Sequence, residues 1–380
     1  MNRVRSGPRL VRGLFLWSSC LLALPAAAAP YLPSDDAQVL EPLPAGVPAA
    51  RARLAVPREP LAAAALARDY IERSRRDGDP RFLGYAEGVL KPWWNEPVPP
   101  APVLLLRATL LQARHRFTDS LRDLDALLVA DPHNAQALLT RATVLRVRGR
   151  YGEAEQSCAG LDGVASAFVT DLCVASVRSL HGALPEMATA LDEMAQDAAR
   201  ESPGVRNWYR AERADMAERL GQDAQALKVY RAALAENGDD PLLRAAAADL
   251  LLRLKQPAQA LKLTGTAPLA DVLRLRTVLA QRALGKKDAA LEAALADSYA
   301  ASRRRGEDVH LREEARFTLE VLGDAARALA LAQDNWAVQR EPADALLLQT
   351  AARAAGKPEA AAPVAAFQKD TGLQDARLAR

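Results

Sequence analysis

The sequence predicts an all-α protein built as a solenoid of stacked helical hairpins. Its composition is the first reason, because half of the 380 residues are apolar but only 5% are aromatic. The apolar share is mostly Ala and Leu, which favour helices, while aromatic β-formers such as Tyr and Phe are scarce. Internal matches that recur at a spacing of 34 residues are the second reason, because a fixed period of this length is typical of repeat proteins.

The first 29 residues are expected to be a secretory signal peptide. Four arginines precede an apolar run at positions 14–24, and a run of small residues follows at 26–29. A positive region, an apolar region and a small-residue cleavage site form such a signal. An uncleaved anchor in the inner membrane is the alternative, although the apolar run is shorter than the roughly 20 residues that span a bilayer. A lipoprotein signal at Cys20 is less favoured, because Trp17 stands where an aliphatic residue is expected.

The apparent basicity of the chain belongs to this signal. The whole chain has a formal net charge of +3, and losing Arg3, Arg5, Arg9 and Arg12 with no acidic residue changes +3 to −1. A nearly neutral surface offers no electrostatic reason to bind nucleic acid. No second hydrophobic stretch approaches membrane-spanning length, so we expect the chain to meet the membrane only transiently through its signal.

Two segments precede the repeats. Residues 30–60 carry five prolines between positions 33 and 57 with few periodic apolar residues, which predicts an extended lead-in. Residues 61–94 have the pattern of a divergent helical hairpin that ends at Trp93 and Trp94. The end unit of a solenoid covers an exposed apolar surface, so its sequence is expected to depart from that of the inner units.

The repeat itself appears in two independent matches. The segments 104–111 (LLLRATLL) and 138–145 (LLTRATVL) are identical at six of eight positions and lie 34 residues apart. The segments 221–228 (GQDAQALK) and 255–262 (KQPAQALK) also match at six of eight positions, at the same spacing. Small residues such as Ala142 recur where two helices would cross, and glycines such as Gly149 recur at the turns, where they accept a left-handed conformation. Asp-Pro or Glu-Pro pairs begin units at 79, 131, 240 and 341.

These features resemble the tetratricopeptide repeat family. The resemblance covers residues 101–369 and implies a right-handed α–α solenoid of about eight to nine helix–turn–helix repeats. Residues 370–380 are expected to be a C-terminal tail. The pattern weakens after about residue 300, because Arg316 and Gln349 stand where the family has a small residue. The repeat register there is expected to slip.

The resemblance also implies a concave groove lined by the first helix of each repeat. Outward positions on those helices make up a mixed polar and apolar face, without the Lys and Asn clamp that family members use to hold an acidic C-terminus. The groove candidates are Thr109, Gln112, Leu139, Thr143, Arg146, Ser176, Ser179, Trp208, Asp215 and Glu218.

Cys158 and Cys173 are the two cysteines that remain after removal of the signal. They would lie on antiparallel neighbouring helices at similar distances from the turn near 164–166, within reach of each other. An oxidising compartment would favour a disulfide between them. The alternative is a pair of small buried apolar residues.

The search for catalytic chemistry finds no strong motif. None of the four histidines has a metal-ligand spacing, and no nucleophile turn or phosphate loop is present. His115 and His181 are expected to be solvated at turns, and the pair Glu313 and Glu314 is expected to be solvated surface charge.

We therefore expect a non-enzymatic scaffold, without cofactor or metal, that binds a protein or peptide in its groove after export, most simply in the periplasm. An assembly or maturation factor for an envelope complex is the alternative role. An enzyme with an unrecognised site is a less favoured one. The sequence does not identify the partner or the oligomeric state.

Overall fold

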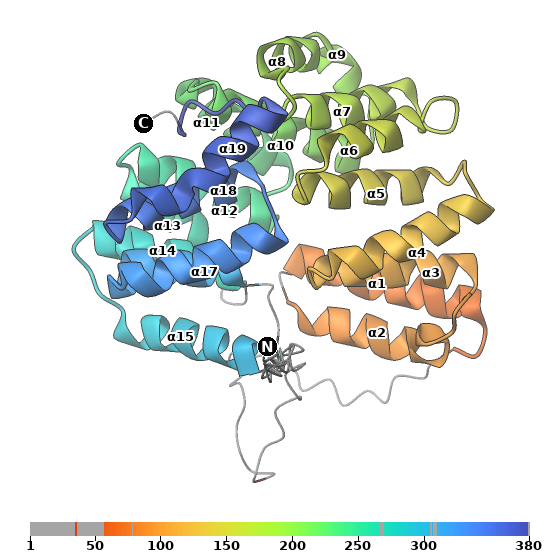
Figure 1. Ribbon diagram of the computed structural model, residues 1–380, viewed down its shortest axis with the longest axis horizontal. Coiled ribbons are helices and arrows are strands. Elements are labelled where there is room, and N and C mark those ends of the chain that lie inside the picture. Colours follow the sequence, from red (N-terminus) through yellow and green to blue (C-terminus); the bar gives the residue numbers. More distant parts are fainter. Residues whose placement is uncertain are drawn as a thin grey trace, which may run out of the picture.

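The computed structural model describes residues 35, 57–77, 79–265, 270–304, 306 and 310–378. These residues form helices and no strand, so the predicted all-α solenoid is confirmed. The expected signal peptide at 1–29 and nearly all of the lead-in at 30–60 lie outside the described residues. Figure 1 shows the helices following one another around the molecule, from α1 to α4 through α5 to α9 and on to α10 to α19.

The described helices form nine antiparallel pairs. The first five pairs are α1 (Pro60–Asp77) with α2 (Arg81–Trp94), α3 (Ala101–Ala113) with α4 (Phe117–Ala130), α5 (Ala135–Val147) with α6 (Tyr151–Ala159), α7 (Ala167–Arg178) with α8 (Leu184–Glu193) and the short α9 (Ala195–Ala198), and α10 (Pro203–Arg219) with α11 (Asp223–Glu236). The other four are α12 (Pro241–Arg253) with α13 (Pro257–Thr264), α14 (Asp271–Ala283) with α15 (Ala289–Arg304), α16 (Leu311–Phe317) and the π-helix η1 (Thr318–Leu322) with α17 (Ala325–Val338), and α18 (Pro342–Ala354) with the 3₁₀ turn η2 (Pro358–Ala361) and α19 (Ala362–Thr371).

Local sequence explains where the helices begin and turn. Asn134, Ser166 and Asp240 accept backbone N–H bonds as N-caps of α5, α7 and α12. The glycines between paired helices have positive φ, as at Gly149 (72°) and Gly182 (83°). These turns need the left-handed conformation that glycine adopts without steric cost. His115 and Lys255 hold the same conformation at two turns that lack a glycine, with φ of 56° and 59°.

The loss of register after residue 300 has a structural cause in one of its two places. The chain passes from α16 into η1, and a π-helical turn takes one more residue than an α-helical turn. The fully buried Ala315 therefore occupies the helix crossing in place of Arg316. No such insertion occurs in α18, where Gln349 stays half-buried and the fully buried small residues are Ala345, Ala351 and Ala352.

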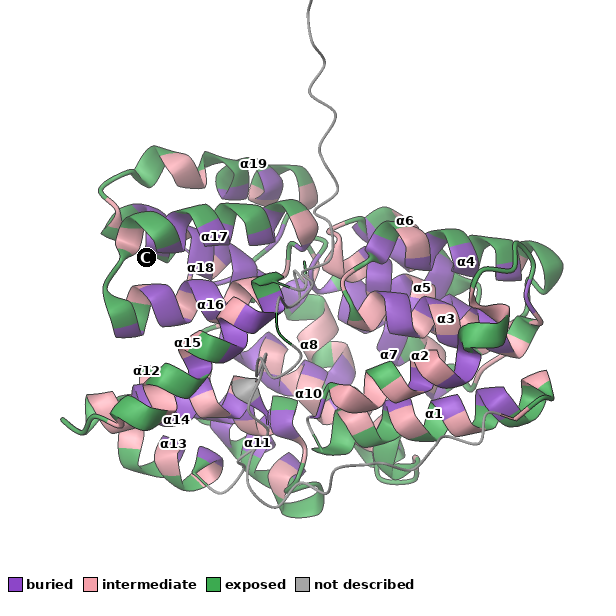
Figure 2. Ribbon diagram, turned by 90° about the horizontal axis from the view of Figure 1, so that it is seen from below, coloured by how far each residue is buried: buried purple, intermediate pink, exposed green. Residues whose placement is uncertain are grey.

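The solenoid closes on itself. First helices stack in series, with α3 against α5, α5 against α7, α12 against α14 and α16 against α18. The largest apolar cluster joins Leu145, Tyr151 and Val177 of the early pairs to Trp336 and Phe367 of the last ones. Figure 1 shows α17, α18 and α19 returning beside the earlier part of the chain. In Figure 2 the buried residues lie on the sides of the helices that face their neighbours, and the outer sides are exposed.

Candidate functional site

None of the ten groove candidates is exposed. Ser176, Ser179 and Glu218 are buried, and the other seven are half-buried: Thr109, Gln112, Leu139, Thr143, Arg146, Trp208 and Asp215. The hydroxyls of Thr109 and Thr143 donate to backbone carbonyls of their own helices. Arg146, Ser179 and Glu218 among them contact other parts of the chain.

Ion pairs between first helices involve some of these candidates. Arg146 on α5 donates to the Glu212 carboxylate on α10 at 2.5 Å, and Trp208 donates to the same oxygen at 3.2 Å. The nearby carboxylate of Glu212 raises the pKa of Arg146 further above its usual range. These side chains bridge α5 and α10 instead of facing solvent.

Arg219 at the end of α10 is buried with its donors satisfied. Its guanidinium donates to Asp215 at 2.8 Å and to the carbonyl and hydroxyl oxygens of Ser179 at 2.7 and 2.8 Å. A buried guanidinium needs such partners, because an unpaired buried charge is strongly destabilising. The contact ties the C-terminal ends of α7 and α10 together.

The returning chain lies along three consecutive helix–helix turns, which we call the turn row: the C-terminal ends of α5, α7 and α10 with Gly149, Gly182 and Gly221. A β-carbon on Gly149 would meet the ring of Phe367 at 2.6 Å. One on Gly372 would meet the Gly182 backbone at 3.0 Å, and one on Gly221 would meet Ala376 at 3.5 Å. The glycines of the turn row thus allow the close approach of residues 367–376.

Backbone hydrogen bonds hold the returning chain to the same helix ends. The last carbonyls of a helix lack partners within the helix. The Arg340 N–H donates to the Val147 carbonyl at the end of α5, and the Ala376 N–H donates to the Arg219 carbonyl at the end of α10, each at 2.8 Å. The Arg148 guanidinium also donates to the Val338 carbonyl at 3.0 Å.

Glu218 is the groove candidate with the most polar contacts. Its carboxylate accepts hydrogen bonds from Tyr230 at 2.8 Å, Arg253 at 2.7 Å and Arg377 at 3.2 Å. Burial raises the pKa of Glu218 despite these donors. Glu218 on α10 therefore contacts α11, α12 and the returning segment.

A second buried ionic cluster was not anticipated from the sequence. Arg312 on α16 binds Glu341 and donates to Asp344 at 2.6 Å, and Asn335 donates to Asp344 at 2.7 Å. Burial works against the charged form of Glu341, yet Arg312 lowers the pKa of that carboxyl. The Glu-Pro pair at 341 gave a signal for a helix start, and Glu341 and Asp344 do form a capping box there.

The other half of this cluster lies between α12, α14 and α16. Asp249 accepts from Arg276 at 2.7 Å and from Arg316 at 3.0 Å, and Arg276 also donates to Glu313 at 3.3 Å. Burial raises the pKa of Asp249, but Arg276 and Arg316 outweigh it, so that pKa is lowered. The expectation that Glu313 and Glu314 are solvated is wrong: Glu314 is buried between Arg303 and Arg327. The one-residue π-helical insertion shifts the repeat register here, so the sequence pattern did not place Glu313 and Glu314 on the inward side of α16.

The two turn histidines differ. His181 is exposed and pairs with Glu155 at 2.7 Å, as a surface residue does. His115 is largely covered, stacks on Phe117 at a ring distance of 5.2 Å, and has no partner for its Nδ1 atom. Burial lowers the pKa of His115 to about 4, and the charge of Arg312 contributes. The prediction of a solvated His115 is therefore wrong.

Cys158 on α6 and Cys173 on α7 are joined by a disulfide in the structure, with their α-carbons 5.5 Å apart. Both residues are buried in the largest apolar cluster. The bond links the second helix of one pair to the first helix of the next pair.

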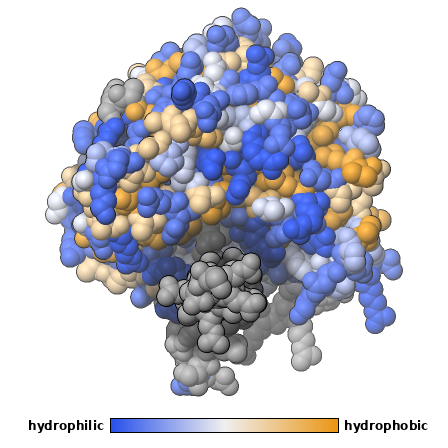
Figure 3. All heavy atoms as spheres, in the orientation of Figure 1, coloured by the Kyte–Doolittle hydropathy of each residue, from blue (hydrophilic) through white to orange (hydrophobic). Residues whose placement is uncertain are grey.

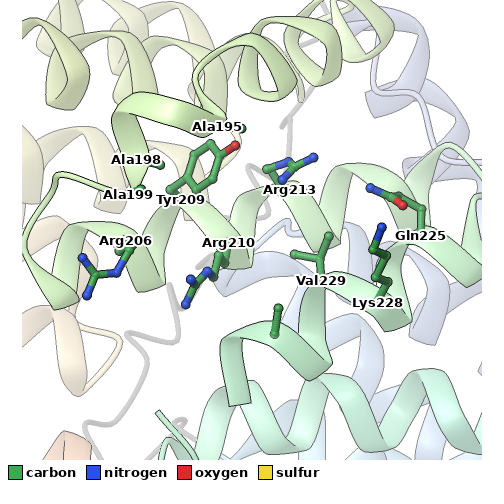
Figure 4. A pocket seen from close by; sticks show the side chains of 11 residues that line it. Ala195, Ala198, Ala199, Arg206, Tyr209, Arg210, Arg213, Gln225, Lys228 and Val229 are labelled. Atoms are coloured by element: carbon green, nitrogen blue, oxygen red, sulfur yellow. The ribbon is translucent and has the colours of Figure 1, made fainter. Parts of the chain in front are cut away.

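An open cavity of about 290 Å³ lies on the outer side, between α9, α10 and α11 (Figure 4). Three of its four cations have partners: Arg206 and Arg210 pair with Glu236, and Arg213 pairs with Asp192. Lys228 is the fourth. The hydroxyl of Tyr209 donates to the Leu191 carbonyl at 2.6 Å. The lining thus carries cationic and neutral polar groups but no carboxylate that could pair with them as an acid or base.

The described surface carries neither a metal-binding cluster nor a concentration of large hydrophobic side chains. No group of three or more His, Cys, Asp or Glu residues in the described part of the chain is arranged to hold a metal ion. On the face in Figure 3, hydrophilic side chains are interspersed with smaller hydrophobic areas. The exposed large hydrophobic residues are distributed over several elements: Leu61, Val98, Val129, Leu242, Leu284 and Leu322. Among the helices that are described, none is long and apolar enough to span a membrane.

Comparison with known proteins gives structural matches only. No protein-family model matches the sequence, and no curated protein matches it. Among solved structures, the chain is similar to a tetratricopeptide repeat protein from Parabacteroides merdae, with a TM-score of 0.37 and 15% identity over 76% of this chain and 99% of that one. It is also similar to the APC/C hetero-tetramer Cut9–Hcn1, with a TM-score of 0.33 and 17% identity over 71% of this chain and 59% of that one. Neither similarity bears on what this chain binds.

Proposed function

We propose that this protein is a non-catalytic scaffold that binds an extended segment of a protein or peptide partner. The observation that carries the proposal is the turn row, which holds a short stretch of polypeptide by backbone and side-chain contacts. Repeated helix ends give such a surface a regular series of carbonyl groups and glycines. The same features that hold residues 372–378 of this chain suit a segment supplied by a partner.

The arrangement of polar groups supports a binding role over a catalytic one. Catalytic acids and bases are usually found with shifted pKa values in a pocket that a substrate can enter. The shifted carboxyls described above, such as Glu218 and Asp249, are bound by arginine or tyrosine inside the closed structure. The open outer cavity has none of these groups in its lining.

The proposal places the protein in the periplasm after export. The amino-terminal arginines and apolar run have the pattern of a secretory signal, and a buried disulfide suits an oxidising compartment. Retention in the inner membrane by an uncleaved signal is the other possible arrangement. Cell fractionation with mass determination of the amino terminus distinguishes the two.

Photo-crosslinking in the native envelope tests the binding role. A photoreactive residue is placed at His181 or Gln222, which are both exposed beside turn-row glycines, and at Lys287, an exposed control in the α14–α15 turn. The proposal expects a partner crosslinked from the first two positions and not from the control. Crosslinks from Lys287 alone, or none from any position in a folded protein, would contradict it.

A further inference from the structure

Residues 372–378, which we call the closing segment, make ligand-like contacts with the turn row. Gly372 ends α19 in a left-handed conformation with φ of 72°, and the chain then continues without regular structure to a turn at 376–378. The backbone of Gly372 lies against Gly182, and the Ala376 N–H donates to the Arg219 carbonyl. The segment thus lies across the ends of α7 and α10.

Three side chains of the closing segment are buried, those of Leu373, Asp375 and Leu378. Leu373 and Leu378 are only 4% and 6% exposed and belong to the same apolar cluster as Val177 and Leu180 of the α7 region. Gln374, between the inward residues, is exposed. Two buried leucines five positions apart therefore provide the apolar anchors of this segment.

Polar contacts fix the position of the segment between these anchors. Arg377 donates to Asp375 at 2.7 and 2.9 Å and to Glu218 at 3.2 Å. Asp375 is 6% exposed, and it also accepts the Arg377 backbone N–H. Burial disfavours the Arg377 cation, but Asp375 and the acidic residues of α10 outweigh it and raise its pKa. Glu218 at the end of α10 thus pairs with a cation that stands next to the apolar anchor Leu378.

These contacts are few compared with those of the neighbouring α19. A single backbone hydrogen bond joins the closing segment to α10, and its side-chain ion pair with α10 is the long one to Glu218. Phe367 on α19, in contrast, packs between the rings of Tyr151 and Trp336 at 5.7 and 5.4 Å. Local opening follows the weakest set of contacts. Release after Gly372 therefore leaves the Phe367 anchor in place.

We propose that the closing segment is a built-in competitor for the partner site. This inference rests on the proposed function. The partner supplies an extended segment of the same chemistry: two leucine-sized apolar residues five positions apart, with an acidic residue two positions and an arginine four positions after the first of them. When the closing segment is docked, the turn row is covered and the partner is excluded. The affinity of the partner is then reduced by the fraction of molecules that are open.

A peptide supplied in trans tests this directly. The probe is a fluorescently labelled, carboxyl-amidated peptide with the sequence of residues 371–378, and binding is measured by anisotropy. The proteins are the full chain, the full chain with Leu373→Asp and Arg377→Ala, and a matched control with Gln374→Asp in the same segment. We expect the double variant to bind at least tenfold more tightly than the parent, because its own segment no longer competes. The Gln374→Asp variant should behave like the parent.

Charge exchange identifies the site. Glu218→Arg, added to the double variant, should abolish binding of the peptide and restore binding of a peptide in which the arginine is replaced by glutamate. If the double variant is unfolded by circular dichroism, hydrogen exchange on the parent protein replaces it. Excess unlabelled peptide should then increase exchange at the Ala376 amide and leave exchange near Phe367 unchanged.

Each outcome decides a different statement. A folded double variant that does not bind the peptide, or equal binding by parent and variant, overturns the competitor role. A variant that becomes a dimer by light scattering also overturns it, because the occupant is then a second copy of this chain. Peptide binding without any crosslinked partner in the envelope leaves the competitor in place and removes the proposed function. A crosslinked partner that binds the parent and the double variant equally supports the proposed function and overturns the competitor role.

Discussion

Substitution of Gly149 by alanine tests whether α19 packs on the α5–α6 turn and closes the solenoid. The same substitution at Gly285 is the control. The two glycines end first helices with nearly the same φ, 72° and 71°. A β-carbon at Gly285 would meet nothing within 4 Å, whereas one at Gly149 would lie 2.6 and 2.7 Å from two ring carbons of Phe367. Both alanine variants therefore incur the same backbone cost. Only the variant at Gly149 also clashes with Phe367, whose position depends on the closed solenoid.

The size of the difference follows from these contacts. An alanine in the left-handed region costs about 1–2 kcal/mol, reduced by about 0.4–1 kcal/mol because the unfolded chain also loses freedom. Gly285→Ala should therefore reduce the free energy of unfolding by about 1 kcal/mol. At Gly149 the Phe367 ring must also move, although Tyr151 and Trp336 hold it. Overpacking of this kind costs about 1–3 kcal/mol, so the total loss should reach about 2–4 kcal/mol.

Urea denaturation followed by circular dichroism at pH 7 measures both losses. Phe367→Leu in the Gly149→Ala background should recover part of the stability, because the smaller side chain leaves space for the new methyl group. The double-mutant cycle should then give a coupling energy above about 1 kcal/mol. Equal losses for the two alanine variants, together with an additive cycle, would refute the closed arrangement of α19 on the α5–α6 turn.

Three further changes address other parts of the structure. Replacing Cys158 and Cys173 together by alanine should lower the free energy of unfolding by about 3 kcal/mol, since the bond closes a loop with a sequence separation of 15; a thiol titration and urea curves with and without reductant check this. The pKa of His115 falls to about 4 in the folded protein, so its contribution is complete above pH 6.5 and is lost as the pH falls toward 4. His115→Asn should reduce the loss of stability between pH 7 and pH 5, and unchanged pH dependence would argue against it. Lys255→Gly should raise the free energy of unfolding by about 0.5–1 kcal/mol, because it removes a left-handed lysine, and a lower midpoint in urea would contradict this.

The repeats could be predicted because they depend on local chemistry. The Asp240 cap and the glycine turn at Gly221 act within a few residues of their own positions, so the sequence pattern carries them directly. The failures have different physical origins. The π-helix η1 adds one residue, and the spacing of the apolar residues around Arg316 does not reveal this insertion.

The closure itself could not be read from the repeats. The predicted tail at 370–380 was assigned by the end of the repeat pattern, yet Leu373 and Leu378 are buried in the largest apolar cluster. The pattern places residues on first helices but does not say how far the superhelix turns. Glu218 and Ser179 are buried, and their contacts with Arg377 and Arg219 depend on the three-dimensional path of the chain.

Closure also changes what a binding event can do to this solenoid. In an open array each repeat contacts its neighbours only, so local opening stays local. Here Arg148 and Val338 are hydrogen-bonded although they lie 190 residues apart, which ties the third helix pair to the eighth. Phe367 and the buried ion pairs hold the solenoid closed. Release of the few residues after Gly372 therefore does not require the solenoid to open. A partner can therefore gain access to the turn row by displacing Leu373 and Leu378 from the apolar cluster, while Phe367 keeps its contacts with Tyr151 and Trp336.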